Sequence, residues 1–202
     1  MKKIKFQIPF FKKKKTQKLE SITMEGKKVI LRKLKISDAL FAFDTFEDHR
    51  GKCYHPFNNL KTDDDVAIYL MNFVSRYDEG KSIGWAITSS KTNEFIGMIQ
   101  IPFLYPEERN CSLNFYIVQG LKKDYLEETI NLVCGYLFAS GLVRRIQAKI
   151  DAEDTFNEQV LKNTGFVYEG TQRKYAYYNE TYHDVKMYSL LEDEVVVQEE
   201  KQ

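Results

Sequence analysis

The sequence predicts an α/β fold in which many strands form a sheet with helices packed on it, and three observations support this. Segments with apolar residues at every second position alternate with segments at helical spacing, in the order βααβββαβαββ. The 202 residues are enough for one domain with terminal extensions. Hydrophobic residues make up 43% of the chain, which allows a substantial core, and no apolar run approaches the roughly 18 residues of a membrane span.

Charge is distributed unevenly along the chain. Residues 1–18 contain eight lysines and no acid, so the remainder carries a net charge of −7 although the whole chain carries +1. Like charges packed this densely cannot all be buried. We therefore expect residues 1–22 to form a disordered basic arm, residues 23–194 to form the domain, and residues 195–202 to form an acidic tail.

The three cysteines, Cys53, Cys111 and Cys134, are widely spaced and form no CxxC pair, so neither a disulfide framework nor a zinc site is indicated. The apolar stretch after Lys5 is too short for a signal-peptide core. A reducing cytoplasm is the simplest compartment. There the basic arm is expected to contact the ribosome or an anionic membrane, or to act only as a solubilising tail, and no specific DNA binding is expected.

The first half of the chain predicts a strand, two helices and three further strands. Lys28 to Arg32 reads as a strand, and Ser37-Asp38 is an N-cap signal for a first helix. A loop over His49 to Thr62 precedes a second helix, which Asp63 to Asp65 cap and Gly80 ends. The three strands that follow are Gly84 to Thr88, Phe95 to Phe103 and Cys111 to Val118.

The second half predicts two helices, each followed by strands. A long helix begins near Asp124 and ends at Gly141. A strand over Val143 to Ile150 leads to a short helix that either Asp154 or Thr155 caps. After Asn163-Thr164-Gly165, the segments Phe166 to Tyr178 and Thr181 to Leu190 form a hairpin around Asn179-Glu180.

Several fragments of the sequence, taken in order, resemble the GNAT N-acetyltransferase superfamily and its ribosomal-protein-alanine acetyltransferase-like branch. The fragments are Leu31-Arg32 with Ser37-Asp38, Phe138 to Ile146, Asn157 to Phe166 (NEQVLKNTGF), Tyr168-Glu169-Gly170, Tyr182 to Val185, and Tyr188 to Leu191. The resemblance covers about residues 25 to 194. It implies a central mixed, mostly antiparallel twisted sheet flanked by helices, acetyl-CoA as cofactor, and a primary amine as acceptor, such as a protein or peptide N-terminus.

The resemblance also implies where the cofactor binds. A strand end would pair with the pantetheine arm, and the next helix N-terminus would hold the pyrophosphate. The residues concerned are Tyr116, Ile117, Val118, Lys122, Lys123, Asp124, Tyr125 and Asn157. The loop is degenerate, because Lys122 and Asp124 stand where the family has two glycines. Asp124 and Glu127 read as a capping box that would occupy the amides the phosphate needs, and the alternative is a well-capped helix that binds nothing.

The expected catalytic positions also depart from the family pattern. Ser112 stands where many relatives carry a glutamate general base, and Asp154 stands where they carry an asparagine. Asp154 either accepts a hydrogen bond from the amine, directly or through water, or is an ordinary helix N-cap. Tyr54 and His55 lie in the loop that shapes the acceptor pocket in relatives. We expect an acetyl-CoA-dependent N-acetyltransferase, and the alternative is a catalytically weakened GNAT-like binding or regulatory module.

Overall fold

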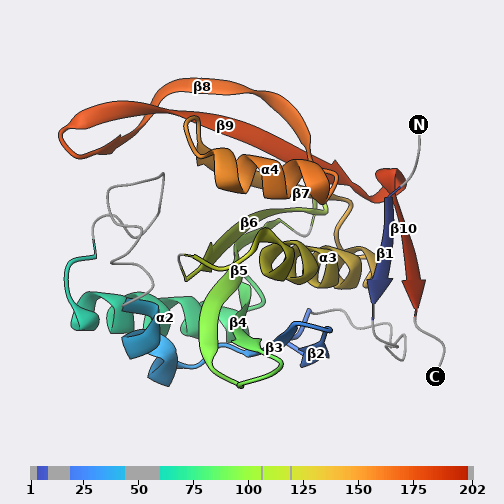
Figure 1. Cartoon of the computed structure of the whole chain (residues 1–202), viewed down its shortest axis with the longest axis horizontal. Helices are drawn as coiled ribbons and strands as arrows, with labels where there is room; N and C mark the ends of the chain where they lie inside the picture. Colours follow the sequence, from blue (N-terminus) through green and yellow to red (C-terminus); the bar gives the residue numbers. More distant parts are fainter. Residues whose placement is uncertain (1–3, 9–18, 44–59, 106, 119, 200–202) are drawn as a thin grey trace.

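The computed structural model of the protein, shown in Figure 1, describes residues 4–8, 19–43, 60–105, 107–118 and 120–199. Within these residues, eight strands form one sheet in the order β2-β3-β4-β5-β6-β7-β9-β8, and two strands form a second sheet. The strands of the large sheet are β2 (Met24–Glu25), β3 (Val29–Lys33), β4 (Ile83–Ser89), β5 (Phe95–Tyr105), β6 (Asn110–Ile117), β7 (Arg145–Asp151), β8 (Val167–Tyr178) and β9 (Thr181–Leu191).

Neighbouring strands of the large sheet pair antiparallel, except that β6 and β7 pair parallel. The predicted mixed, mostly antiparallel sheet is therefore confirmed. Strands β3 to β9 correspond one for one to the seven predicted strands, and β2 was not predicted. The single parallel pair requires a crossover connection, which the helix between β6 and β7 provides.

Three helices among the described residues flank the sheet: α2 (Asp63–Asp78), α3 (Lys123–Ala139) and α4 (Thr155–Asn163). The predicted first helix begins as the 3₁₀ turn Ile36–Asp38 and is helical to residue 43, where the described range stops. The cap of α2 differs from the prediction. Thr62, not the aspartates after it, is the N-cap, because its hydroxyl accepts from the Asp65 amide at 3.1 Å and the Asp65 carboxylate accepts from the Thr62 amide at 3.0 Å. No helix in the described segments is long and apolar enough to span a bilayer.

The two faces of the sheet carry different cores. On one face, α3 packs Leu126, Ile130 and Val133 against alternate residues of the strands. On the other face, α2 packs Val66 and Leu70 in a smaller cluster. Because successive side chains of a strand point to opposite faces, each central strand contributes to both layers.

Glu128 on α3 fixes the turn between β2 and β3. Its carboxylate accepts hydrogen bonds from the backbone amides of Lys27 and Lys28, both at 2.8 Å, and of Val29 at 3.2 Å. Gly26 is required next to it, since a Cβ there would lie 2.8 Å from the Glu128 Cδ. The edge of the sheet is therefore attached to the first half of α3.

The second sheet joins the two ends of the chain. Strand β1 (Ile4–Ile8) pairs in parallel with β10 (Val195–Glu199), and Figure 1 shows the two strands side by side next to α3. The sequence analysis placed these residues in a disordered arm and an acidic tail, and the structure differs. The apolar residues of β10 supply a strand partner that composition alone did not reveal.

The core also begins earlier in the chain than expected. Leu19 is 5% exposed and Met24 is fully buried, and both belong to the core under α3. The indole of Trp85 donates a hydrogen bond of 2.8 Å to the carbonyl of Ile22. The segment from residue 19 onward is therefore part of the domain rather than of an arm.

Candidate active site

The parallel pairing of β6 and β7 is short. Asn110–Leu113 pair with Arg145–Ala148, and beyond Leu113 and Ala148 the two strands have no further ladder partners in one another. On the other side of β6, the register with β5 shifts between Gln100 and Phe103, which marks a β-bulge. The sheet is therefore irregular at its centre, where β6 stops pairing with β7.

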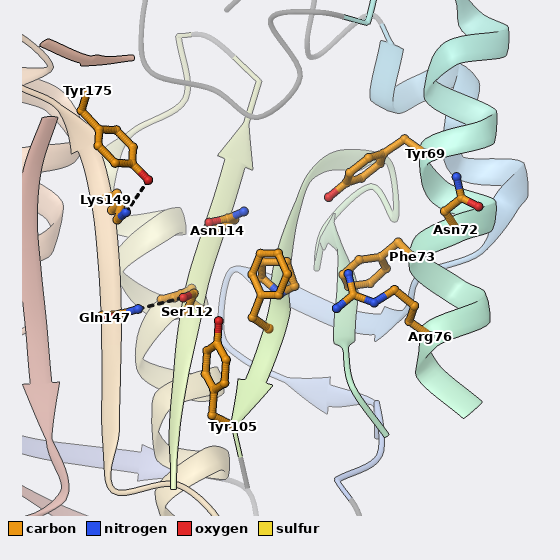
Figure 2. A pocket seen from close by; sticks show the side chains of 13 residues that line it. Tyr69, Asn72, Phe73, Arg76, Tyr105, Ser112, Asn114, Gln147, Lys149 and Tyr175 are labelled. Carbon is orange, nitrogen blue, oxygen red and sulfur yellow. Dashed lines mark hydrogen bonds between the residues drawn. The ribbon is translucent and has the colours of Figure 1, made fainter. Parts of the chain in front are cut away.

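A cavity of about 490 Å³ lies beside this junction. Its walls come from α2, β5, β6, β7 and β8, and Figure 2 shows the side chains of α2 facing those of the strands across it. The lining residues are Tyr69, Asn72, Phe73, Arg76, Pro102, Phe103, Tyr105, Ser112, Leu113, Asn114, Gln147, Lys149 and Tyr175. The volume lies within the range of roughly 300–1,000 Å³ that is typical of small-molecule sites.

Alternate residues of the two central strands supply the polar wall of the cavity. Ser112 and Asn114 on β6, and Gln147 and Lys149 on β7, face it. The Gln147 amide donates to the Ser112 hydroxyl at 3.0 Å. The Lys149 ammonium donates to the Tyr175 hydroxyl at 2.7 Å and lies 4.1 Å from the centre of that ring. The residues that alternate with these polar residues along the strands, such as Ala148 between Gln147 and Lys149, are buried in the core on the α3 face of the sheet.

Helix α2 supplies the facing wall. The Tyr69 hydroxyl donates to the buried Gln100 side chain at 3.0 Å, and burial raises the pKa of Tyr69, so the phenol stays protonated at neutral pH. The Arg76 guanidinium lies 5.1 Å from the centre of the Phe103 ring. Among the described lining residues, Arg76 and Lys149 are the charged ones, and none is a carboxylate.

The start of α3 differs from the predicted capping box. Lys122 is the N-cap, in extended conformation, and no side chain accepts a hydrogen bond there. Asp124 instead forms an ion pair with Lys28, and the Lys28 ammonium lowers the pKa of Asp124. Glu127 accepts a hydrogen bond from Asn163 at 2.6 Å. The predicted capping box is therefore absent, but competition between Asp124 and a phosphate for these amides stays a prediction, since the Tyr125 amide also helps to lower the pKa of Asp124.

The start of α4 lies next to the start of α3. The Lys123 ammonium is 5.7 Å from the centre of the Phe156 ring. Asp154 is the N-cap of α4, one of the two predicted alternatives. Its two carboxylate oxygens accept from the Asn157 amide at 2.9 Å and from the Asn157 side chain at 2.6 Å.

The structure places the predicted site residues that it describes in four places. Ser112 lines the cavity, whereas Asp154 lies at the start of α4 and is not among the lining residues. Tyr116 and Ile117 end β6 with buried side chains, and the Val118 amide donates to the Ile96 carbonyl at 2.9 Å. Lys122, Lys123 and Asp124 begin α3, and Tyr125 packs partly buried against the core. Tyr54 and His55 lie outside the described residues.

Most residues of the cavity were missed from the sequence. Tyr69 and Phe73 fall at helical spacing within α2, which is typical of a core stripe, and Tyr175 lies within a strand, so their residue types and spacing do not mark a site. The alternation of polar residues in Ser112-Leu113-Asn114 and Gln147-Ala148-Lys149 was the available signal, since it marks a polar face in two otherwise buried strands.

Known proteins resemble this chain in sequence and in fold. A curated relative, the uncharacterized N-acetyltransferase YoaA of Bacillus subtilis, is 27% identical over 83% of this chain and 96% of its own length. The ribosomal-protein-serine acetyltransferase of Escherichia coli is 22% identical over 79% of this chain and 97% of its own. A solved ribosomal L7/L12 alpha-N-protein acetyltransferase in complex with coenzyme A superposes with a TM-score of 0.74 at 16% identity, covering 82% of this chain and 95% of that one.

The microcin C7 self-immunity acetyltransferase MccE, solved with acetyl-CoA and AMP, superposes with a TM-score of 0.73 at 14% identity over 82% of this chain and 93% of its own. At these identities the solved structures establish the fold. The sequence profile of the acetyltransferase (GNAT) domain matches residues 28–167, which is more than half of the chain. The chain therefore belongs to the GNAT acetyltransferase family.

Proposed function

We propose that this acetyltransferase uses acetyl-CoA and transfers the acetyl group to a primary amine at a protein or peptide N-terminus. One observation carries the proposal. The point at which β6 and β7 cease to pair lies between the cavity on the α2 side of the sheet and the start of α3 on the other side. A cofactor on the α3 side and an acceptor on the α2 side would meet there. The relatives named as ribosomal-protein acetyltransferases support a protein acceptor.

The residues at the start of α3 fit the cofactor. A helix N-terminus without a side-chain cap leaves backbone amides for a pyrophosphate, and Lys122 and Lys123 add positive charge. The end of β6, from Asn114 to Val118, would lie along the pantetheine arm, because β7 leaves this edge. Acetyl-CoA supplies, when bound, an acetyl group activated as a thioester. Asp154 accepts a hydrogen bond from the Asn157 side chain at the start of α4, and from there Asn157 would contact the cofactor.

The cavity on the α2 side would bind the amine that accepts the acetyl group. It offers no strong base among the described residues. The Ser112 oxygen accepts from Gln147, which leaves the Ser112 proton to donate. Ser112 therefore orients the acceptor or a water molecule, and the proton of the amine passes to water. Phe73, which is buried, and Phe103, which is half-exposed, give the cavity an apolar wall.

Calorimetric titration of acetyl-CoA tests the cofactor site. Lys122→Ala and Lys123→Ala should each weaken binding by about tenfold, the equivalent of about 1.4 kcal/mol for one lost charge-assisted contact. Lys91→Ala, an exposed lysine in the turn between β4 and β5, is the matched control and should bind as the parent does. No heat at millimolar acetyl-CoA would remove the proposal. Mass spectrometry of a peptide library incubated with acetyl-CoA then identifies the acetylated amine.

A further inference from the structure

The cavity beside the β6–β7 junction holds two cations on opposite walls. Figure 2 shows Arg76 projecting from α2 and Lys149 projecting from β7. The walls between them are largely aromatic, with Phe73, Phe103 and Tyr175 among them. Arg76 and Lys149 are each only partly buried, so both remain accessible to an anionic group that enters the cavity, with which they could form charge-assisted hydrogen bonds.

Neither cation has a carboxylate partner among the described residues. Arg76 lies over the Phe103 ring, and Lys149 donates to the Tyr175 hydroxyl. The neighbouring cation on β7 behaves differently, since Arg145 pairs with both oxygens of Glu169 at 2.9 and 2.5 Å. Lys186 on β9 likewise pairs with Glu158 at 2.6 Å. Arg145 and Lys186 are thus paired with carboxylates, whereas Arg76 and Lys149 form no salt bridge with a described carboxylate, although the charge of Arg76 contributes, after Lys81, to lowering the pKa of Glu79.

We infer that the cavity selects an acceptor that carries an anionic group close to its amine, and specifically the N-terminus of an acidic peptide. This rests on the proposed function. The carboxylate would lie between Arg76 and Lys149, while the amine reaches Ser112 and Asn114 beside the junction. A cavity of about 490 Å³ admits a short peptide end rather than a folded partner.

The positive charge of Arg76 and Lys149 also disfavours acceptors that are themselves basic. An N-terminus followed by lysine would bring a third positive charge into the cavity and meet no described carboxylate there. Specificity would therefore come from repulsion of cationic acceptors as much as from attraction of anionic ones. Because these charge interactions are partly exposed to solvent, added salt should weaken the discrimination between anionic and cationic acceptors.

Three matched pentapeptides test the inference with the full chain and acetyl-CoA: Ser-Glu-Ala-Ala-Trp and its Gln and Lys counterparts at the second position. We expect kcat/KM to fall in the order Glu, Gln, Lys, with about tenfold or more between Glu and Lys at low salt. Arg76→Gln and Lys149→Gln should each lose more kcat/KM on the Glu peptide than on the Gln peptide. Lys91→Gln, far from the cavity in sequence, should preserve the order. Phosphoethanolamine, as a further acceptor, distinguishes recognition of a phosphate from recognition of a carboxylate.

Each outcome is decisive. Equal rates on the three peptides, a preference for the Lys peptide, or phosphoethanolamine outpacing the Glu peptide would overturn the inference and leave the proposed acetyltransferase function standing. If no acceptor is acetylated, the proposed function fails, and equilibrium binding of the same peptides to the full chain still judges the inference. Tighter binding of the Glu peptide than of the Lys peptide, lost in Arg76→Gln, would support it, and equal binding would overturn it.

Discussion

Ser112 occupies a position where a proton acceptor would be useful, and its hydrogen bond decides what it can do. Its oxygen already accepts from Gln147 at 3.0 Å, and a serine hydroxyl is a weak base without a partner that takes its proton. We therefore expect Ser112 to orient the acceptor amine or a water molecule rather than to abstract a proton. The same holds for Asp154, whose two oxygens are both engaged by Asn157.

Ser112→Ala is therefore expected to lower kcat by less than about tenfold, since only an orienting hydrogen bond is lost, whereas removal of a general base costs roughly 10²–10⁴-fold. Steady-state kinetics on an acetylated peptide checks this. Ser90→Ala, whose hydroxyl donates to the Lys27 carbonyl away from the cavity, is the control. A loss of a hundredfold or more would show that Ser112 takes part directly in proton transfer.

The elements of the fold are held to one another by a few buried or half-buried carboxylates, and Glu128 is the first of them. It accepts three backbone amides of the β2–β3 turn, at 2.8, 2.8 and 3.2 Å. Glu128→Ala leaves these amides without their acceptor and should lower the free energy of unfolding by about 2–3 kcal/mol. Urea denaturation measures it. Glu127→Ala, which loses one exposed hydrogen bond to Asn163, should cost less than about 1 kcal/mol.

Glu158 ties α4 to β9 and makes stability depend on pH. The Lys162 and Lys186 ammonium groups, with the Tyr188 hydroxyl, lower the pKa of Glu158 to about 2 from its ordinary 4.5. A carboxyl whose folded pKa is depressed contributes stability fully above about pH 4.5, and this contribution is lost as pH falls toward 2.

Glu158→Gln should therefore destabilise the protein by about 1–2 kcal/mol at pH 7, less than the full linkage value because solvent screens the partly exposed lysines. The difference from the parent should shrink as pH falls from 5 to 2. Chemical denaturation at a series of pH values measures it, with the exposed Glu153→Gln as control. A difference that stays constant over that range would contradict the low pKa.

The sequence predicted elements better than the contacts between them. Apolar periodicity identified seven strands of the large sheet and the three helices, because period and burial are local properties. Asp124 is an example of a contact that periodicity does not predict. The local sequence favoured a capping box, but the Asp124 carboxylate pairs with Lys28, which is 96 positions away in sequence. To predict the cavity, one would need the register of β6 with β7, which places Ser112 beside Gln147. No local sequence pattern gives that register.

At the scale of the whole molecule, the ends of the chain contribute to the fold. Leu19 is buried in the main core, and β1 pairs with β10. The sequence analysis predicted a disordered basic arm over residues 1–22, and the structure leads to a different expectation for residues 4–8 and 19–22. Contact of the arm with the ribosome or with an anionic membrane stays a prediction, since Lys12 to Lys15 lie outside the described residues.

Deletion of residues 1–20 should lower the melting temperature, because it removes β1 and the buried side chain of Leu19. Leu19→Ala alone should cost about 2–4 kcal/mol through the cavity it leaves. Deletion of residues 1–3, before β1 begins, is the control and should leave the transition in place. Thermal unfolding monitored by circular dichroism decides it, and an unchanged transition in the long deletion would mean that β1 adds nothing to stability.

The parallel pairing of β1 with β10 also sets an order of events during synthesis. Strand β1 leaves the ribosome before its partner, residues 195–199, has been synthesised. At about 5–20 residues per second, synthesis of the segment between β1 and β10 takes on the order of 10–40 s, during which β1 has no β10 to pair with. Such an unpaired edge invites association with other chains. We expect the mutual repulsion of the lysines clustered within residues 1–18 to oppose such association between neighbouring nascent chains.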